Sequence, residues 1–149
     1  NATIISKAGL KRLGLTENIT QTLPTDVFPP SVGQGAIAVI SRSDFDAIDL
    51  LYKINHKNTM AAVTAERALL KSLGGGCQVP IGVVSNINKT KININAVVLS
   101  PDGKWKVTTA IKGDIEEAKE IGNKAALKLL QGGAEEILKD VYGQVPSTE

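Results

Sequence analysis

The chain contains few of the residues that build disulfide bonds and structural metal sites. Its 149 residues include one cysteine and one histidine. One cysteine cannot close an intrachain disulfide, and one cysteine with one histidine cannot supply the ligands of a structural zinc site. We therefore predict no metal site, and the scarcity of cysteine favours a reducing, cytoplasmic compartment.

Long hydrophobic runs and an excess of charge of one sign are also missing. The apolar stretch at residues 36–40 is typical of the longest runs, and it is far shorter than the roughly 18 residues that indicate a membrane-spanning helix. With 17 basic and 15 acidic side chains, the formal net charge of +2 gives no nucleic-acid-binding footprint. We expect neither a membrane nor a nucleic acid as a partner.

The sequence is nevertheless hydrophobic enough to form a core. Aromatic residues make up only 3%, but 42% of the residues are hydrophobic and 21% are charged, which argues against disorder. The length fits one domain, or one compact domain with an appendage. Residues 1–6 lack the features of a signal peptide and are typical of a strand entered partway, so we expect a piece of a longer protein.

The first third of the sequence predicts short elements separated by an irregular segment. Residues 3–5 are typical of a strand, and residues 8–14 of a short helix that stops at a glycine. Three prolines and two glycines in residues 23–35 predict a crossover or hinge. The apolar run at residues 36–40 predicts a strand covered on both faces, and the helical spacing after Asp44 predicts a helix capped by that residue.

The remaining two thirds predict an α+β domain. A helix starts at Asn58 or Thr59 and ends at the glycines of residues 74–76. Alternating apolar residues then predict three antiparallel strands within residues 81–85, 92–98 and 105–111. Asp114 is expected to cap the next helix, and the glycine pair at residues 132–133 to separate it from a final short helix. The fold class we expect is a small three-stranded antiparallel sheet with helices on one face.

The most informative segment is the Gly-Gly-Gly-Cys-Gln-Val-Pro stretch at residues 74–80, which contains Cys77. Its three glycines leave room for a bulky group beside the sulfur. A lone cysteine is more often a small buried apolar residue, and that interpretation stays open. A phosphate-binding loop does not fit, because such loops lead into a helix whereas these glycines leave one. Since the end of the preceding helix disfavours a thiolate, a permanent attachment fits Cys77 better than a turnover nucleophile.

A few other polar residues are candidates for function. The only histidine, His56, lies at a polar helix end, which favours a capping or solvated role. Each of the arginines, Arg12, Arg42 and Arg67, can hold a carboxylate, although an ordinary surface or structural ion pair remains the default for each one. We expect Arg67 to stabilise the segment at residues 74–80, which is called the cysteine loop below. The glycines of residues 33–35 place backbone amides beside a ligand or simply form a tight turn.

Three of these segments, taken together, resemble a known family. Residues 32–36 read Val-Gly-Gln-Gly-Ala, residues 64–68 read Thr-Ala-Glu-Arg-Ala, and residues 75–82 read Gly-Gly-Cys-Gln-Val-Pro-Ile-Gly. In this order and spacing they resemble the carboxyl-terminal half of porphobilinogen deaminase, also called hydroxymethylbilane synthase. The similarity begins at residues 8–14 and covers nearly the whole chain.

The resemblance implies a transferase of tetrapyrrole and heme biosynthesis. Members of the family join four porphobilinogen units, release ammonia at each addition, and free the linear product hydroxymethylbilane. The growing chain is built on a dipyrromethane cofactor that a thioether holds to the cysteine of the third motif, which is Cys77 here. Arg12 matches an arginine that pairs with the acetate and propionate groups in the cleft. Gln34 and Gly35 match a segment that lines the cleft.

The resemblance also implies a domain organisation. Residues 1–31 would finish the second domain, an α/β domain, and residues 32–56 would return a strand and a helix to the first, also α/β. Residues 57–149 would form the third, cofactor-bearing α+β domain. The catalytic aspartate of the family lies upstream, so this chain holds no catalytic residue, and we expect no cofactor assembly or turnover from it alone. Its natural partner would be the missing amino-terminal domains, and the surface they leave exposed could drive self-association.

Two other classes of function stay open beside the resemblance. A small α+β domain with a helix-backed sheet is also suited to a ligand-sensing regulatory module, which would bind an effector and carry nothing on its sulfur. Cys77 could instead be a redox or acyl-carrying thiol of a different enzyme. Alkylation of a free, reactive sulfur in fresh protein would then be expected.

Overall fold

The chain divides into two parts that differ in burial. Its structure, a computed structural model, describes residues 1–44, 46–76 and 79–143. Every buried side chain in those residues comes from Ala65 or later, and none comes from residues 1–56. The hydrophobic core therefore belongs to the carboxyl-terminal part of the chain. Within the described ranges, no helix combines the length and the apolar character that crossing a membrane requires.

Three antiparallel strands form the sheet of that part. They are β1 (Ile81–Asn88), β2 (Lys91–Leu99) and β3 (Lys106–Asp114), paired in the order β1-β2-β3. Lys89, at φ 55°, lies in the turn between β1 and β2, and Gly103, at φ 71°, lies in the turn between β2 and β3. The predicted sheet of three antiparallel strands is confirmed.

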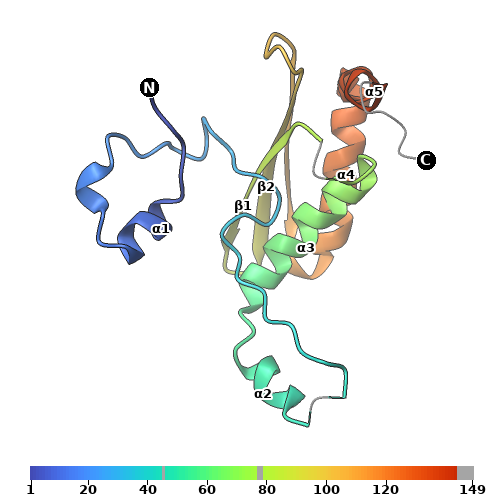
Figure 1. The fold of residues 1–149 in the computed structure, drawn as a ribbon. Helices are drawn as coiled ribbons and strands as arrows, with labels where there is room; N and C mark the ends of the chain where they lie inside the picture. The colour runs from blue at the N-terminus through green and yellow to red at the C-terminus, as the bar shows by residue number, and fades with distance from the viewer. Residues whose placement is uncertain (45, 77–78, 144–149) are drawn as a thin grey trace.

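Two helices cover one face of the sheet (Figure 1). They are α3 (Lys57–Ser72) and α4 (Ala118–Leu129). Every second residue of β2 faces the core and is buried, as expected for a strand with one covered face: Ile92, Ile94, Ala96 and Val98. Leu69 of α3 and Leu129 of α4 join them with no exposed surface. The predicted α+β class, with its helices packed on one face, is thus the observed one.

The two helices approach each other closely at Gly122 of α4. A Cβ atom on Gly122 would lie 2.1 Å from the backbone oxygen of Ala65 and 2.9 Å from the Cβ of Ala68. Both of these contacts come from α3, so only a residue without a side chain fits between the helices. Ala125 and Ala126 of α4 are also fully buried, which keeps the interhelical distance short.

The two predicted helix caps of this domain differ in outcome. The Nδ1 atom of His56 accepts a hydrogen bond of 3.3 Å from the backbone of Thr59, which confirms a capping role at the start of α3. Asp114 makes no capping bond, and the helix begins instead with the 3-10 turn η2 (Ile115–Glu117). The reason is that Asp114 faces Lys91 across β2 and β3, and its carboxylate forms an ion pair of 2.8 Å with that lysine.

The last helix turns back against the core. The segment η3 (Leu130–Ala134) contains Gly133 at φ 99°, and α5 (Glu135–Gly143) follows it. Ile137 and Leu138 of α5 are 1% and 4% exposed. The predicted interruption at the glycine pair is confirmed, and it lets α5 bury its own apolar residues in the same core as α4.

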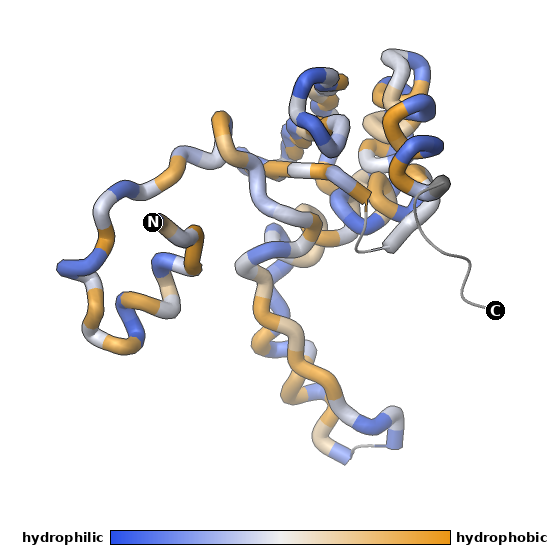
Figure 2. Tube along the Cα trace, turned by 45° about the horizontal axis from the view of Figure 1, so that its top comes forward, coloured by the Kyte–Doolittle hydropathy of each residue, from blue (hydrophilic) through white to orange (hydrophobic). Residues whose placement is uncertain are grey.

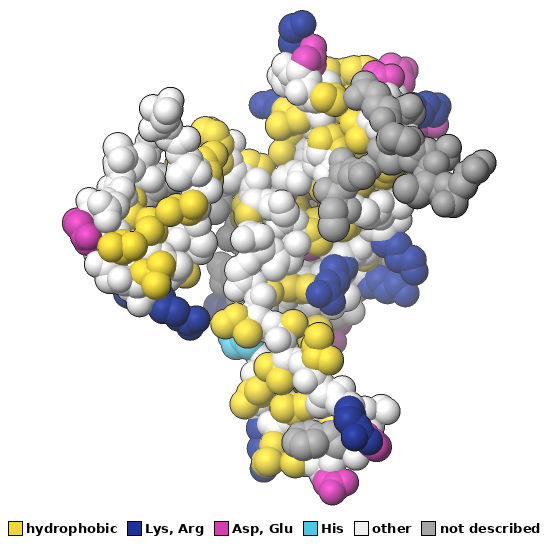
Figure 3. Space-filling view, viewed as in Figure 1, with side chains coloured by type: hydrophobic (Ala, Val, Ile, Leu, Met, Phe, Trp, Pro, Cys, Tyr) yellow, Lys and Arg dark blue, Asp and Glu magenta, His cyan; other side chains and the backbone are white. Residues whose placement is uncertain are grey.

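Residues 1–56 contain only short helices. They are α1 (Lys7–Arg12), the 3-10 turn η1 (Thr16–Asn18) and α2 (Ile48–Lys53), and none has a buried residue. Figure 1 shows α1 and α2 apart from the sheet, and Figure 2 shows hydrophobic residues all along both regions. Figure 3 shows hydrophobic side chains gathered on the surface of the regions that contain α1 and α2. Ile37 and Ile40, for example, are 91% and 92% exposed.

Three predictions for this part of the chain are wrong. Residues 3–5 and 36–40 form no strand, because a strand needs a hydrogen-bonding partner and the described chain provides none beside them. The helix after Asp44 starts only at Ile48, with Ala47 as its N-cap. The Asp44 carboxylate is engaged by Arg42, so it does not cap the helix. Phe45, an expected apolar residue of that helix, lies outside the described residues.

The close contact of α3 and α4 gives a first prediction. The change Gly122→Ala forces a methyl group into the Ala65 backbone and should lower the free energy of unfolding by about 1–3 kcal/mol, as overpacking does. Denaturant unfolding followed by circular dichroism measures it. The matched control is Gly9→Ala in α1, where the nearest atom to a new Cβ is 3.9 Å away and the stability of the core should not change. Equal stability of the Gly122→Ala variant and the parent would refute the proposed contact.

Candidate functional site

The structure describes Arg12, Gln34 and Gly35 among the predicted site residues. Cys77 lies outside the described residues, so the structure gives no account of its surroundings. Arg12 is the last residue of α1 and is exposed, and Figure 1 shows α1 apart from the sheet and from α3. Gln34 and Gly35 lie in a tight turn that precedes the apolar run. Among the described residues, the carboxyl-terminal domain therefore does not bring Arg12 close to the turn that contains Gln34 and Gly35.

The turn around Gln34 has a defined backbone. Gly33 and Gly35 adopt φ values of 72° and 84°, a region that favours glycine. The amide of Gln34 donates to the Ser31 oxygen over 3.1 Å, and the amide of Ala36 donates to the Gly33 oxygen over 3.2 Å. Gln34 thus sits between two glycines with its side chain exposed, and the predicted tight turn is confirmed.

Helix α3 holds this turn through Glu66. The Oε2 atom of Glu66 accepts a partly buried hydrogen bond of 2.8 Å from the backbone amide of Gly33. The two residues are 33 positions apart in the sequence, so this contact joins the first and second motifs in space. Arg67, the neighbour of Glu66, is exposed. Its expected contact with the cysteine loop falls partly on residues 77–78, which lie outside the described residues.

Residues 29–35, named here the docking strap, also contact β1. The carbonyl oxygen of Pro30 accepts a hydrogen bond of 2.8 Å from the amide of Val83. A Cβ atom on Gly82 would lie 2.7 Å from both the Cγ and the backbone oxygen of Pro29. Gly82 is the last residue of the third motif. The docking strap therefore brings parts of all three motifs to the start of β1.

The described residues on either side of Cys77 have defined positions. Before it, Gly75 and Gly76 have φ values of 64° and 113°, and an added Cβ on either would meet no described atom within 4 Å. After it, Val79 is 7% exposed, and the Pro80 oxygen accepts a hydrogen bond of 3.1 Å from Leu99. Val79 and Pro80 therefore attach the chain that follows Cys77 to the core and to β2.

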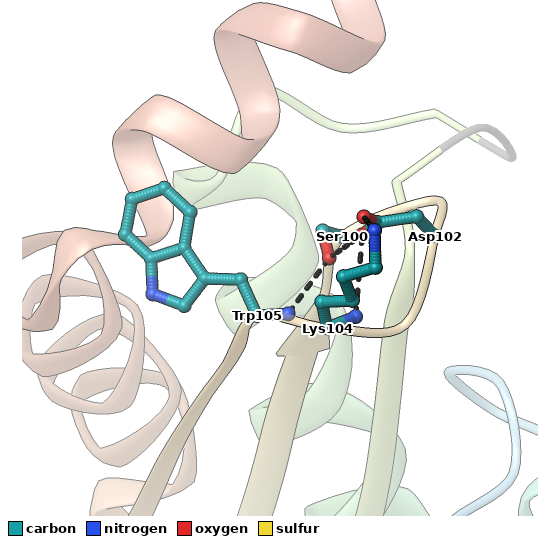
Figure 4. A network of polar contacts seen from close by, with 4 residues as sticks. All are labelled: Ser100, Asp102, Lys104 and Trp105. Carbon is teal, nitrogen blue, oxygen red and sulfur yellow. Dashed lines mark hydrogen bonds and ion pairs between the residues drawn. The ribbon is translucent and has the colours of Figure 1, made fainter.

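A second turn lies at the same end of the sheet, between β2 and β3 (Figure 4). Asp102 accepts hydrogen bonds from the Ser100 hydroxyl at 2.6 Å and from the Lys104 amide at 3.2 Å. The Ser100 oxygen in turn accepts from the Trp105 amide at 2.9 Å. The bond from Ser100, followed by those from Lys104, holds the pKa of Asp102 below its usual range. This network fixes the hairpin without any buried charge.

Within the ranges that the structure describes, no cluster of His, Cys, Asp or Glu side chains is placed to hold a metal ion. Sequence reasoning missed the roles of Glu66 and Pro30. Glu66 carries a signal, because it is a carboxylate on the same helix as the buried Ala65 and Leu69. No sequence signal points to Pro30, because its contact uses a backbone oxygen, which every residue has.

Comparison with known proteins identifies the family of this chain. The sequence model of "Porphobilinogen deaminase, dipyromethane cofactor binding domain" matches residues 1–49. The model of "Porphobilinogen deaminase, C-terminal domain" matches residues 60–131. The chain belongs to the porphobilinogen deaminase family. The docking strap lies in the first match, and α3 with the sheet and α4 lies in the second.

Curated relatives agree with this assignment. The chain is 42% identical over 129 residues to a probable porphobilinogen deaminase of Methanothermobacter thermautotrophicus, covering 87% of this chain and 45% of that protein. It is 44% identical over 140 residues to the porphobilinogen deaminase of Pelotomaculum thermopropionicum, covering 93% and 45%. For the enzyme of Geotalea uraniireducens the identity is 40% over 153 residues, covering 100% and 47%. The chain thus spans somewhat less than half the length of these relatives.

The contact between Glu66 and Gly33 can be tested in the chain itself. The change Glu66→Ala removes a charged acceptor and should speed hydrogen exchange of the Gly33 amide on the order of ten-fold. Glu66→Gln keeps an acceptor oxygen and should have a smaller effect. Exchange measured by NMR reports both. The matched control, Glu120→Ala on the exposed side of α4, should leave Gly33 unchanged. If Gly33 exchanges equally fast in the parent and in Glu66→Ala, the contact is absent.

The hairpin network predicts a pH dependence. Because the folded-state pKa of Asp102 is lowered, its contribution to the turn is present above its unfolded pKa and is lost as pH falls through the folded value. The amide shift of Lys104, which donates to Asp102, should therefore titrate below the usual range of an aspartate. Asp102→Asn should abolish this titration, whereas Asp26→Asn in the amino-terminal segment should not alter it. If the Lys104 amide shift still titrates in the Asp102→Asn variant, the hydrogen-bond network is contradicted.

Proposed function

We propose that this chain is the carboxyl-terminal part of a porphobilinogen deaminase, a transferase that joins porphobilinogen units into hydroxymethylbilane with release of ammonia. The observation that supports this most strongly is the meeting of the three family motifs at the start of β1. Glu66 accepts a hydrogen bond from Gly33, Pro30 accepts one from Val83, and a Cβ on Gly82 would meet Pro29. The alternatives, a ligand-sensing module and a redox or acyl-carrying thiol, gain no support from the family match.

In this proposal Cys77 anchors the dipyrromethane cofactor through a thioether. A Cβ added to Gly75 or Gly76 would meet no described atom within 4 Å, which fits a bulky group next to the sulfur. Pro80 and the buried Val79 fix the far end of the loop to the sheet. When bound, the dipyrromethane supplies the primer to which pyrrole units are added. The role of this domain is then to hold that primer in place.

Arg12 is proposed to contact the carboxylate groups of cofactor or substrate, and Gln34 and Gly35 to line the cleft. Arg12 is exposed at the end of α1, where its guanidinium can form bidentate hydrogen bonds with a carboxylate. Gln34 has an exposed amide side chain in a turn that Glu66 holds at a fixed place on α3. Because the backbone of this turn is already held, less backbone freedom is lost when a ligand binds, which suits a cleft-lining role.

The proposed partners of this chain are the upstream domains of the same enzyme. Residues 1–31 would finish the second domain, residues 32–56 would return to the first, and residues 57–149 would form the third. The apolar side chains of the first two stretches support this, because they find no core here and are largely exposed: Ile4, Ile5, Leu13, Val27, Phe28, Ile37, Val39 and Ile40. Such side chains would pack against another part of the protein.

The mass of the Cys77 peptide tests the proposed function. In the complete enzyme that contains this chain, we expect the peptide to carry two linked pyrrole units, read by mass spectrometry after proteolysis. The isolated chain should release no ammonia from porphobilinogen, because the family's catalytic aspartate lies upstream.

The control is Cys77→Ser in the complete enzyme, which should lose both the added mass and the activity. Since this chain has a single cysteine, an adduct on sulfur in the peptide that contains Cys77 is assigned to that residue. An active complete enzyme with an unmodified Cys77 thiol would overturn the anchoring role. Robust turnover by the isolated chain would overturn the need for upstream domains.

A further inference from the structure

The carboxyl end of α3 has a regular glycine cap that does not engage the carbonyl of the C-cap residue, Leu73. The Gly74 amide donates to the Lys71 oxygen over 3.2 Å, and the Gly75 amide donates to the Leu70 oxygen over 2.9 Å. With Gly74 at φ 102°, this is the Schellman arrangement, which satisfies carbonyls of the last turn. It does not use the carbonyl of Leu73, the C-cap residue. Leu73 lies four positions before Cys77.

The Leu73 carbonyl instead accepts a hydrogen bond from Tyr142 of α5. Its hydroxyl donates a partly buried hydrogen bond of 3.1 Å to the Leu73 oxygen, across 69 positions of sequence. The side chain also lies directly on the backbone of the cap, because a Cβ on Gly74 would be 2.8 Å from the Tyr142 oxygen and 3.4 Å from its Cζ. Gly74 is thus required twice, once by its positive φ and once by the space that Tyr142 occupies.

The position of Tyr142 is itself fixed by the core. Gly133 redirects the chain into α5, and a Cβ there would lie 3.3 Å from the Trp105 ring. Ile137 and Leu138 are nearly fully buried, one turn before Tyr142. The tyrosine therefore reaches Leu73 from a helix that two buried residues hold in place, so its hydrogen bond can restrain the start of the cysteine loop.

We infer that Tyr142 is a positioning residue that fixes the direction in which the cysteine loop leaves α3. This inference rests on the proposed function, because it gives the loop the task of presenting the dipyrromethane on Cys77. Without the hydroxyl, water replaces Tyr142 as the hydrogen-bond donor to the Leu73 carbonyl, and residues 74–76 become more mobile. The thioether can still form, as the Cys77 sulfur bonds to the aminomethyl carbon of porphobilinogen, the carbon–nitrogen bond breaks and the thiol proton leaves with the ammonia. It forms more slowly, since the sulfur spends less time in the orientation that the cleft requires.

Two measurements on matched variants test the inference. The change Tyr142→Phe deletes only the hydroxyl and should speed hydrogen exchange of the Gly74 and Gly75 amides in the full chain about five-fold, the loss of one neutral hydrogen bond. In the complete enzyme it should slow loading of Cys77 by a similar factor at an unchanged melting temperature. The control is Tyr52→Phe at the only other tyrosine, which is 69% exposed and should change neither rate.

A second variant approaches the contact from the loop. Gly74→Ala displaces the tyrosine and should change both rates in the same direction as Tyr142→Phe. Unchanged glycine exchange in Tyr142→Phe would overturn the contact, and faster exchange with normal loading would overturn the positioning role. If the parent enzyme itself carries no pyrrole on Cys77, the proposed function and this role fail, while the exchange data still decide whether Tyr142 holds the cap.

Discussion

The packing of α3 against α4 and the sheet is the constraint on which the rest of the structure depends. The face of α3 that carries Ala65 and Leu69 is fully buried. Because Gly122 of α4 has no side chain, α4 packs closely against α3. The segments proposed to form the site are then attached to the same helix. Its middle turn holds the docking strap through Glu66, and its last turn releases residues 74–76 towards Cys77. A shift of α3 would therefore move every part of the site together.

In the proposed function, this arrangement lets a small domain present a covalently held group without a buried active site of its own. The described residues that flank Cys77 are tied to the core, by Tyr142 before it and by Val79 and Pro80 after it. A Cβ added to Gly75 or Gly76 would meet no described atom within 4 Å. Restrained residues on both sides of Cys77 suit the proposed carrier role, whereas a catalytic pocket needs enclosing walls and polar groups placed around the reacting atoms.

Local signals in the sequence predicted the carboxyl-terminal fold well. The helix 57–72, the three strands and the glycine interruption depend on spacing, turns and caps within a few residues. The strands at residues 3–5 and 36–40 failed because strand formation needs a partner that this chain does not supply. Asp44 and Asp114 failed as caps because Arg42 and Lys91 bind their carboxylates. The Glu66 and Tyr142 contacts span 33 and 69 positions, and no local pattern encodes such a distance.

Hydrogen exchange of a single amide tests the central claim, which is that the docking strap brings the family motifs together on β1 and α3. Val83 lies on the edge strand of the sheet, and its amide donates to Pro30 of the strap rather than to β2. In the full chain, our account predicts that this amide is protected far beyond an edge-strand amide open to water. An amide of Val83 that exchanges at the rate of an unstructured peptide would show that the strap does not dock and would contradict the account.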